Sequence, residues 1–229
     1  MKNYRIFFWS ITVALGGFLF GFDTAVISGA EQDIQKIWDL DAIQHGLTVS
    51  IALIGTVIGA MFGGIPSDRL GRKKTLIWIA MLYLVSALGS ALAFDWYTFM
   101  IFRLLGGLGV GASSVAAPLY ISEISPPDRR GRLVALFQFN VVFGILIAYL
   151  SNYLLGGIGP MAWRWMLGVE AIPAIAFLVL LLNVPESPRW LIIKKNDVQG
   201  ARKTLEVIAG DKVQELIDSI KASRHERKE

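Results

Sequence analysis

Apolar residues along this chain gather into six long runs, and short polar segments separate these runs. Each run reaches the roughly 20 residues that an α-helix needs to cross the hydrocarbon core of a bilayer. Such segments must be helical, because hydrocarbon offers their backbone N–H and C=O groups no hydrogen-bonding partner. The pattern predicts an all-α membrane protein with six transmembrane helices, at residues 6–29, 46–66, 75–94, 98–122, 133–156 and 163–184.

The segment after the sixth run has a different pattern. Pro185 and Pro188 end the last span, because proline cannot continue a helix. Beyond them, apolar residues recur at helical spacing in two short stretches, which predicts two amphipathic helices in the cytoplasmic tail. The two stripes are Val198, Ala201, Leu205 and Ile208, and then Val213, Leu216, Ile217 and Ile220. We therefore divide the chain into a six-helix bundle at residues 1–189 and a region of short helices and tail at 190–229.

Basic residues are distributed unevenly between the two ends of the predicted spans. Of the 22 lysines and arginines, only Lys36 and Arg164 fall in the loops on one side, and Arg103 lies within a span. All the others lie at the N-terminus, in the alternate loops and in the tail. Because cytoplasmic segments carry the excess of positive charge, the sequence predicts a multi-pass protein of the plasma (inner) membrane with both termini cytoplasmic.

Composition agrees with a membrane protein and excludes several other classes. The chain is 54% hydrophobic and only 17% charged, which is too apolar for a soluble domain. The basic residues form short clusters and no continuous basic face, so we expect no nucleic-acid partner. Cysteine is absent and the two histidines, His45 and His225, are isolated, so we expect neither a metal site nor a cofactor. The glycines at 106–111 follow no strand and indicate close helix packing, and no nucleophile–base pair suggests an enzyme.

Two ionisable residues lie within the predicted spans. At 1.5 Å per residue, we expect Asp23 about 10 Å from the outer end of the first span and Arg103 about 8 Å from that of the fourth. Opposite charges at matched depth predict an ion pair inside the bundle, where an acid can bind and release a proton. The alternatives are a static salt bridge or two side chains that reach the outer interface. Glu170, in the sixth span, receives no assignment.

The fifth span carries a second polar signal. Gln138, Ile145, Tyr149 and Asn152 fall on one helical face. Their amide and phenol groups would suit the hydroxyls of a polar solute, and they would equally suit hydrogen bonds between helices. The residue types alone do not separate these two interpretations.

Several motifs resemble those of the sugar porter family of the major facilitator superfamily, which includes bacterial sugar/proton symporters and glucose facilitators. Gly21–Gly29 is similar to the first-helix signature of the family, and Ser67–Lys74 resembles the loop motif of the superfamily. Arg103–Gly111 resembles the fourth helix, and Glu123, Arg129–Arg132 and Pro185–Leu191 complete the set. The resemblance covers nearly the whole chain. It implies the N-terminal six-helix half of the fold, which is built from two inverted three-helix repeats.

The resemblance also implies roles for individual residues. Asp23 matches the protonatable acid of the first helix and Arg103 matches its partner, so proton symport is favoured over facilitated diffusion. Phe20 and Gln138 match residues that line the sugar site, and Ile145 stands where some symporters have a second glutamine, so the sugar itself is not implied. A cytoplasmic network of charged residues that gates the transporter is implied for Asp68, Arg69, Arg72, Glu123, Arg130, Glu186 and Arg189.

Complete members of the family hold the sugar between two six-helix halves, and this chain matches only the first. The resemblance therefore implies proton-coupled transport of a monosaccharide by alternating access. The implied partners are the sugar, protons, the lipid bilayer and a second half, which would come from a separate chain, a homodimer mate or a missing C-terminal domain. The competing interpretation is a truncated, non-transporting membrane fragment, or a sensor or assembly subunit. An exporter of drugs or organic anions is a third possibility.

Overall fold

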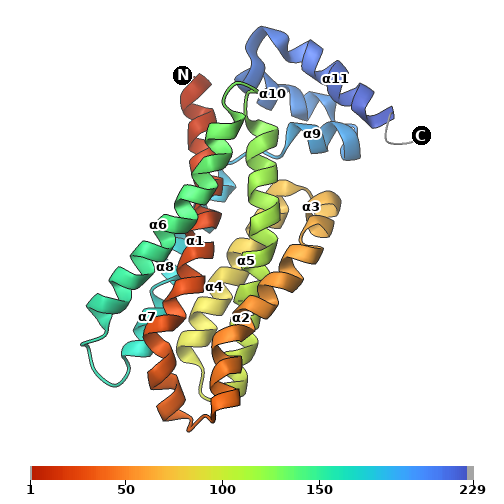
Figure 1. The fold of residues 1–229 in the computed structure, drawn as a ribbon. Coiled ribbons are helices and arrows are strands. Elements are labelled where there is room, and N and C mark those ends of the chain that lie inside the picture. Colours follow the sequence, from red (N-terminus) through yellow and green to blue (C-terminus); the bar gives the residue numbers. More distant parts are fainter. Residues whose placement is uncertain (1, 226–229) are drawn as a thin grey trace.

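The computed structural model describes residues 2–225 and shows a bundle of long helices with shorter helices across one end (Figure 1). The bundle consists of α1 (Lys2–Ile37), α2 (Ala42–Phe62), α4 (Arg72–Leu92), α5 (Trp96–Ile124), α6 (Arg130–Leu155), α7 (Ala162–Gly168) and α8 (Ala171–Leu182), with a short α3 (Gly64–Leu70) after α2. Helices α7 and α8 together form one span, Ala162–Leu182, so 6 segments among the described residues are long and apolar enough to cross a membrane. The predicted fold class is confirmed.

The first helix is longer than the sequence pattern predicted. It continues through a polar stretch to Ile37, whereas the apolar run suggested an end near residue 29. Asp23 therefore lies 14 residues before the end of α1, about 21 Å along the helix axis, whereas the predicted distance of about 10 Å was measured from the end of the apolar run. A helix can continue beyond the end of an apolar run, because its backbone hydrogen bonds also form in water. Polar side chains are suited to the part of the helix that extends out of the hydrocarbon core.

Close helix crossings at glycines hold the bundle together. A Cβ atom on Gly21 of α1 would lie 1.9 Å from the carbonyl oxygen of Val141 on α6, and one on Gly107 of α5 would lie 2.1 Å from that of Ala52 on α2. Only glycine permits these backbones to approach so closely. In a bilayer such contacts supply much of the association energy, because lipid removes the hydrophobic driving force between helices.

The least covered spans are α2 and α6, with 22% and 28% of their apolar windows buried, against 78% for α1. Both present rows of exposed large apolar side chains, among them Val57 and Met61 on α2 and Phe139 and Leu146 on α6. Helix α6 packs against α1 and α2 packs against α5, so α2 and α6 lie on opposite sides of the bundle and flank its open face (Figure 1).

The chain after α8 packs across one end of the bundle (Figure 1). It forms α9 (Pro188–Trp190), the π-helical η1 (Leu191–Lys195), α10 (Val198–Ala209), the 3-10 turn η2 (Gly210–Lys212) and α11 (Val213–His225). The two amphipathic helices are therefore present, and their stripes meet in a separate small core of Ile192, Ala201, Leu205, Val213 and Ile217. The division at residues 189 and 190 stays a prediction, and residues 226–229 of the predicted region of short helices and tail lie outside the described residues.

Candidate functional site

A buried ion pair lies at the centre of the bundle. Nη1 of Arg103, on α5, donates to Oδ1 of Asp23, on α1, across 2.6 Å, and Nη2 donates to the backbone carbonyl oxygen of Asp23 across 3.1 Å. Each side chain is only 2% exposed. The ion pair expected from the sequence is thus present. Because both charged groups are buried, the alternative in which the two side chains reach the outer membrane interface is excluded.

Glu170 joins this pair from the junction between α7 and α8. It is 2% exposed, and its Oε1 atom has no hydrogen-bond partner. Its carboxyl group lies close enough to interact with both Asp23 and Arg103. One guanidinium can balance only one carboxylate, and an uncompensated charge in a dry interior is costly. The cluster therefore holds two carboxyl groups and a single guanidinium.

The residues implied to bind sugar lie on α1 and α6. Gln138 is exposed, whereas Phe20 and Ile145 are partly buried and pack against the core of the bundle. Two further candidates that the sequence did not single out are Thr24 and Ser28, which follow Phe20 by one and two turns on the same face of α1 and are exposed. An exposed polar stripe on the otherwise most buried helix is the signal that identifies them.

Asn152 does not share the environment of the other polar residues on α6. It is 8% exposed, and its Nδ2 atom donates to the carbonyl oxygen of Val26 across 3.1 Å. The side chain also packs against Gly29, where it fills the space of a missing Cβ. Asn152 thus ties α6 to α1, while Tyr149 stays 54% exposed. For Asn152, hydrogen bonding between helices is the correct interpretation.

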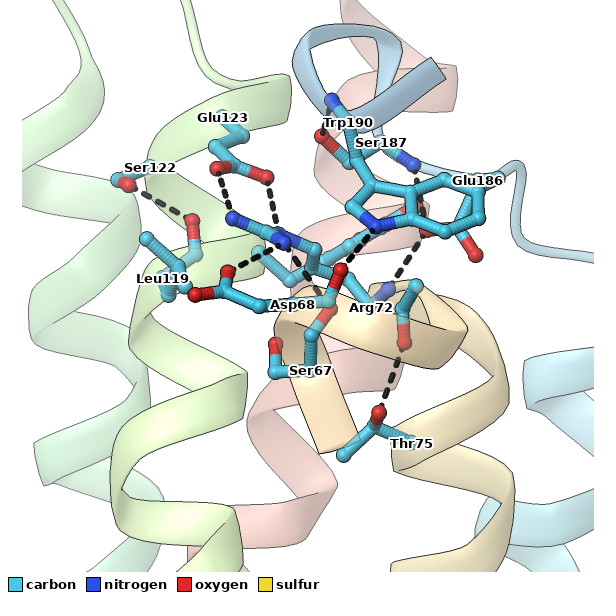
Figure 2. A network of polar contacts seen from close by, with 12 residues as sticks. Ser67, Asp68, Arg72, Thr75, Leu119, Ser122, Glu123, Glu186, Ser187 and Trp190 are labelled. Carbon is cyan, nitrogen blue, oxygen red and sulfur yellow. Dashed lines mark hydrogen bonds and ion pairs between the residues drawn. The ribbon is translucent and has the colours of Figure 1, made fainter. Parts of the chain in front are cut away.

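A second charged cluster lies at the end of the bundle where α9 to α11 pack, and Figure 2 shows its contacts. The guanidinium of Arg72 forms two bonds with the carboxylate of Glu123, each 3.0 Å long. Its Nη1 atom donates to Oδ1 of Asp68 across 3.1 Å and to the carbonyl oxygen of Ser67 across 3.0 Å. The pair with Glu123 is nearly dry, because the two side chains are 10% and 6% exposed, whereas Asp68 is 61% exposed.

Glu186 belongs to the same cluster but binds backbone (Figure 2). Its carboxylate accepts from the backbone N–H groups of Arg72 at 2.9 Å and Lys73 at 3.0 Å. These groups open α4, whose own N-cap residue, Gly71, supplies no side-chain bond. A carboxylate there satisfies free N–H groups and the positive end of the helix dipole. Gly71 has φ of 101°, and a Cβ on it would lie 2.4 Å from Oε2 of Glu186, so glycine is required.

The remaining members of the predicted network are less engaged. Nε of Arg130 donates to the carbonyl oxygen of Ser122 across 3.0 Å, and Arg130 and Arg189 line one cavity of about 540 Å³ together with Glu123. Arg69 is exposed and forms no ion pair within residues 2–225. Sequence reasoning missed Trp190, whose indole donates to the carbonyl oxygen of Asp68 across 2.9 Å. An aromatic residue next to a charged motif gave only a weak signal for such a bond.

Six spanning segments around a buried charge cluster define an all-helical, multi-pass membrane protein. The chain belongs to the sugar (and other) transporter family, which matches residues 9–229. Members of this family are transporters and not enzymes. The resemblance seen in the sequence motifs is thus confirmed.

Individual relatives agree with this assignment. The chain is 46% identical to the glucose transport protein of Synechocystis over 221 residues, which cover 92% of this chain and 47% of that protein. It is 36% identical to the D-xylose-proton symporter of Escherichia coli K12, over 96% of this chain and 52% of the symporter. The solved structure of the proton:xylose symporter XylE with 6-bromo-6-deoxy-D-glucose superimposes with a TM-score of 0.94 at 36% identity, over 99% of this chain and 54% of that structure. The chain therefore spans about half the length of the relatives it matches.

Proposed function

We propose that this chain forms the N-terminal six-helix half of a proton-coupled monosaccharide transporter of the plasma membrane, with both termini in the cytoplasm. The observation that carries the proposal is the buried cluster of Asp23, Arg103 and Glu170, which offers two carboxyls to one cation. The printed names of relatives support the substrate class, because they include glucose and xylose transporters and proton symporters.

In this proposal Asp23 carries the proton and Arg103 modulates it. When Asp23 is ionised, the 2.6 Å ion pair fastens α1 to α5. A proton on Asp23 removes the charge that Arg103 neutralises, so the pair weakens and the two helices are free to shift. A bound proton can shift the equilibrium between two conformations only if it binds one of them more tightly than the other. In this proposal, proton binding must therefore favour one arrangement of α1 and α5.

The sugar would bind at the open face of the bundle. The exposed amide of Gln138 and the hydroxyl of Thr24 would hydrogen-bond to sugar hydroxyls, and the ring of Phe20 would pack against the apolar face of the sugar. A second six-helix half would cover the exposed apolar side chains of α2 and α6 and complete the cavity. Alternating access would then rock the two halves around the bound sugar.

The cluster around Arg72 would act as the cytoplasmic gate. Its pair with Glu123 is nearly dry, and Arg130 and Arg189 line the neighbouring cavity without a carboxylate partner among the described residues. Carboxylates of a second half would form ion pairs with these arginines when the two halves close on the cytoplasmic side. A network at such a seam can bias the equilibrium between the two states although each exposed pair contributes little.

Transport is tested first with the 229-residue chain alone. Labelled pentoses and hexoses are offered to transport-deficient cells that insert the chain, with and without a protonophore. Uptake that the protonophore abolishes shows that the chain assembles into a working symporter by itself. No uptake shows that transport needs the second half, or that the chain is a non-transporting fragment or a sensor.

Coupling is tested in a chimera that joins this chain to the C-terminal half of the E. coli D-xylose-proton symporter. We expect Asp23→Asn to abolish accumulation against a gradient while exchange of labelled for unlabelled sugar continues. Asp39→Asn is the matched control, because Asp39 is exposed in the turn after α1 and should transport normally. Unchanged accumulation with Asp23→Asn contradicts its role as proton carrier, and a chimera without any exchange contradicts transport by this half.

A further inference from the structure

A cavity of about 420 Å³ lies where three segments distant in sequence meet. Arg5 and Trp9 line it from the first turns of α1, Leu182 and Asn183 from the end of α8, and Lys203 from α10. The cavity is on the outside of the bundle and is separate from both the buried ion pair and the cluster around Arg72.

This cavity carries uncompensated positive charge. Arg5 and Lys203 are both exposed, and neither forms an ion pair with a carboxylate in the part of the chain that the structure describes. Lys73 does not line the cavity, but its Nζ atom donates to the carbonyl oxygen of Leu182, one of the lining residues, across 2.9 Å. Two cations from two helices, Arg5 of α1 and Lys203 of α10, thus line one opening, and an anion there would meet positive charge from both.

The cavity also lies at the level where the apolar part of the bundle ends. Leu182 is the last residue of the sixth span. Exposed apolar side chains of α8 form one stripe at helical spacing that ends at this residue: Ile172 at 69%, Ile175 at 48%, Val179 at 52% and Leu182 at 61% exposed. Trp9 adds an aromatic ring to the wall of the cavity, although most of this side chain is buried in the core of the bundle. An apolar track therefore leads directly to a cationic opening.

We propose that this cavity binds the phosphate headgroup of an anionic phospholipid, with an acyl chain along the stripe of α8. The cations at the opening match the phosphate, and the apolar stripe favours a lipid over a soluble phosphate compound. Basic residues next to a bilayer attract anionic lipids in this way. The site is independent of sugar transport and does not rest on the function proposed above.

The test is native mass spectrometry of the detergent-solubilised 229-residue chain, titrated with phosphatidylglycerol or with phosphatidylcholine. We expect Arg5→Gln/Lys203→Gln to weaken the binding of phosphatidylglycerol about 30-fold, since two interfacial cations are lost. Lys212→Gln/Lys221→Gln is the matched control, because it removes two exposed cations at the same end of the molecule. This control should stay within about threefold of the unchanged chain. Circular dichroism shows whether each variant keeps its helices.

Three results would overturn the proposal. The first is equal binding of phosphatidylglycerol by the unchanged chain and by Arg5→Gln/Lys203→Gln. The second is an equal loss in the control variant, which would indicate a general attraction to the basic tail. The third is displacement of the lipid by free glycerol phosphate at the same concentration, which would identify a soluble phosphate as the ligand. Loss confined to Arg5→Gln/Lys203→Gln, with preference for phosphatidylglycerol over phosphatidylcholine, supports it.

Discussion

Arg72 forms ion pairs with two carboxylates, the buried Glu123 and the exposed Asp68. This difference in exposure predicts how much the free energy of unfolding falls when each ion pair is removed. Arg72→Gln removes both bonds to Glu123 and leaves that carboxylate, 6% exposed, without its cation. Breaking a buried pair in this way costs about 3–5 kcal/mol, and the slight exposure of this one places the expected loss near 3 kcal/mol. Asp68→Asn removes the exposed partner of the same guanidinium, 61% exposed, and should cost less than about 1 kcal/mol.

A double-mutant cycle isolates the pair. Glu123→Gln combined with Arg72→Gln leaves no unpaired charge, so the double variant should be more stable than the sum of the two single losses predicts, by roughly 2 kcal/mol. The bonds from the backbone N–H of Arg72 to Glu186 persist in every variant and do not enter the difference. The assay is reversible unfolding of the chain in mixed micelles, followed by circular dichroism. Losses that add to within about 0.5 kcal/mol would refute the reasoning, as would a loss for Asp68→Asn equal to that for Arg72→Gln.

Two further predictions concern glycine packing and pH. Gly107→Ala should destabilise the bundle by several kcal/mol, because its Cβ would lie 2.1 Å from the carbonyl oxygen of Ala52. Gly46→Ala is the control and should stabilise α2 by about 0.5–1 kcal/mol, because a Cβ there would have nothing within 4 Å. The same unfolding assay compares the two variants, and equal effects would contradict the close helix crossing at Gly107. Hydrogen bonds from Thr98 lower the pKa of Asp95, the N-cap of α5, below its ordinary value of 3.8. The ionised cap therefore stabilises the folded state above that value, and this stability is lost as pH falls through the lowered pKa. Asp95→Ala should thus flatten the dependence of the unfolding free energy on pH below about pH 4. An unchanged dependence would show that protonation of this cap is not coupled to folding.

The spans could be predicted because a bilayer imposes a length and a hydrophobicity that few other structures share. The end of α1 could not, since residues 31–36 are mostly polar and yet remain helical. Hydropathy reports where the membrane ends, whereas helix length depends on hydrogen bonding that continues in water. The break between α7 and α8, which places Glu170 beside Arg103, was also hidden in a continuous apolar run.

The buried pair of Asp23 and Arg103 could be predicted because each charge alone would be too costly inside the bundle. The charged cluster at the end of the bundle is different. Arg69 and Arg72 belong to one motif and carry the same charge, yet only Arg72 turns into the seam with Glu123. Their three-residue separation on either side of Gly71 does not reveal which one is buried. That depends on the turn at Gly71, whose φ of 101° sets the direction in which α4 leaves.

The contacts of Glu186 are the feature of the cluster that could least be predicted from the sequence. The motif placed Glu186 in a network of charged residues, but its carboxylate oxygens accept from backbone N–H groups at the start of α4, 113 and 114 residues away in sequence. Every helix leaves such N–H groups free at its first turn, so they carry no signature in the sequence, and only the fold decides which side chain reaches them. Because Gly71 offers no side chain of its own, the segment after α8 must supply the cap. The same contact therefore fastens the last span to the third and positions the guanidinium of Arg72 for Glu123, so the loop motif and the segment after α8 work as one structural unit.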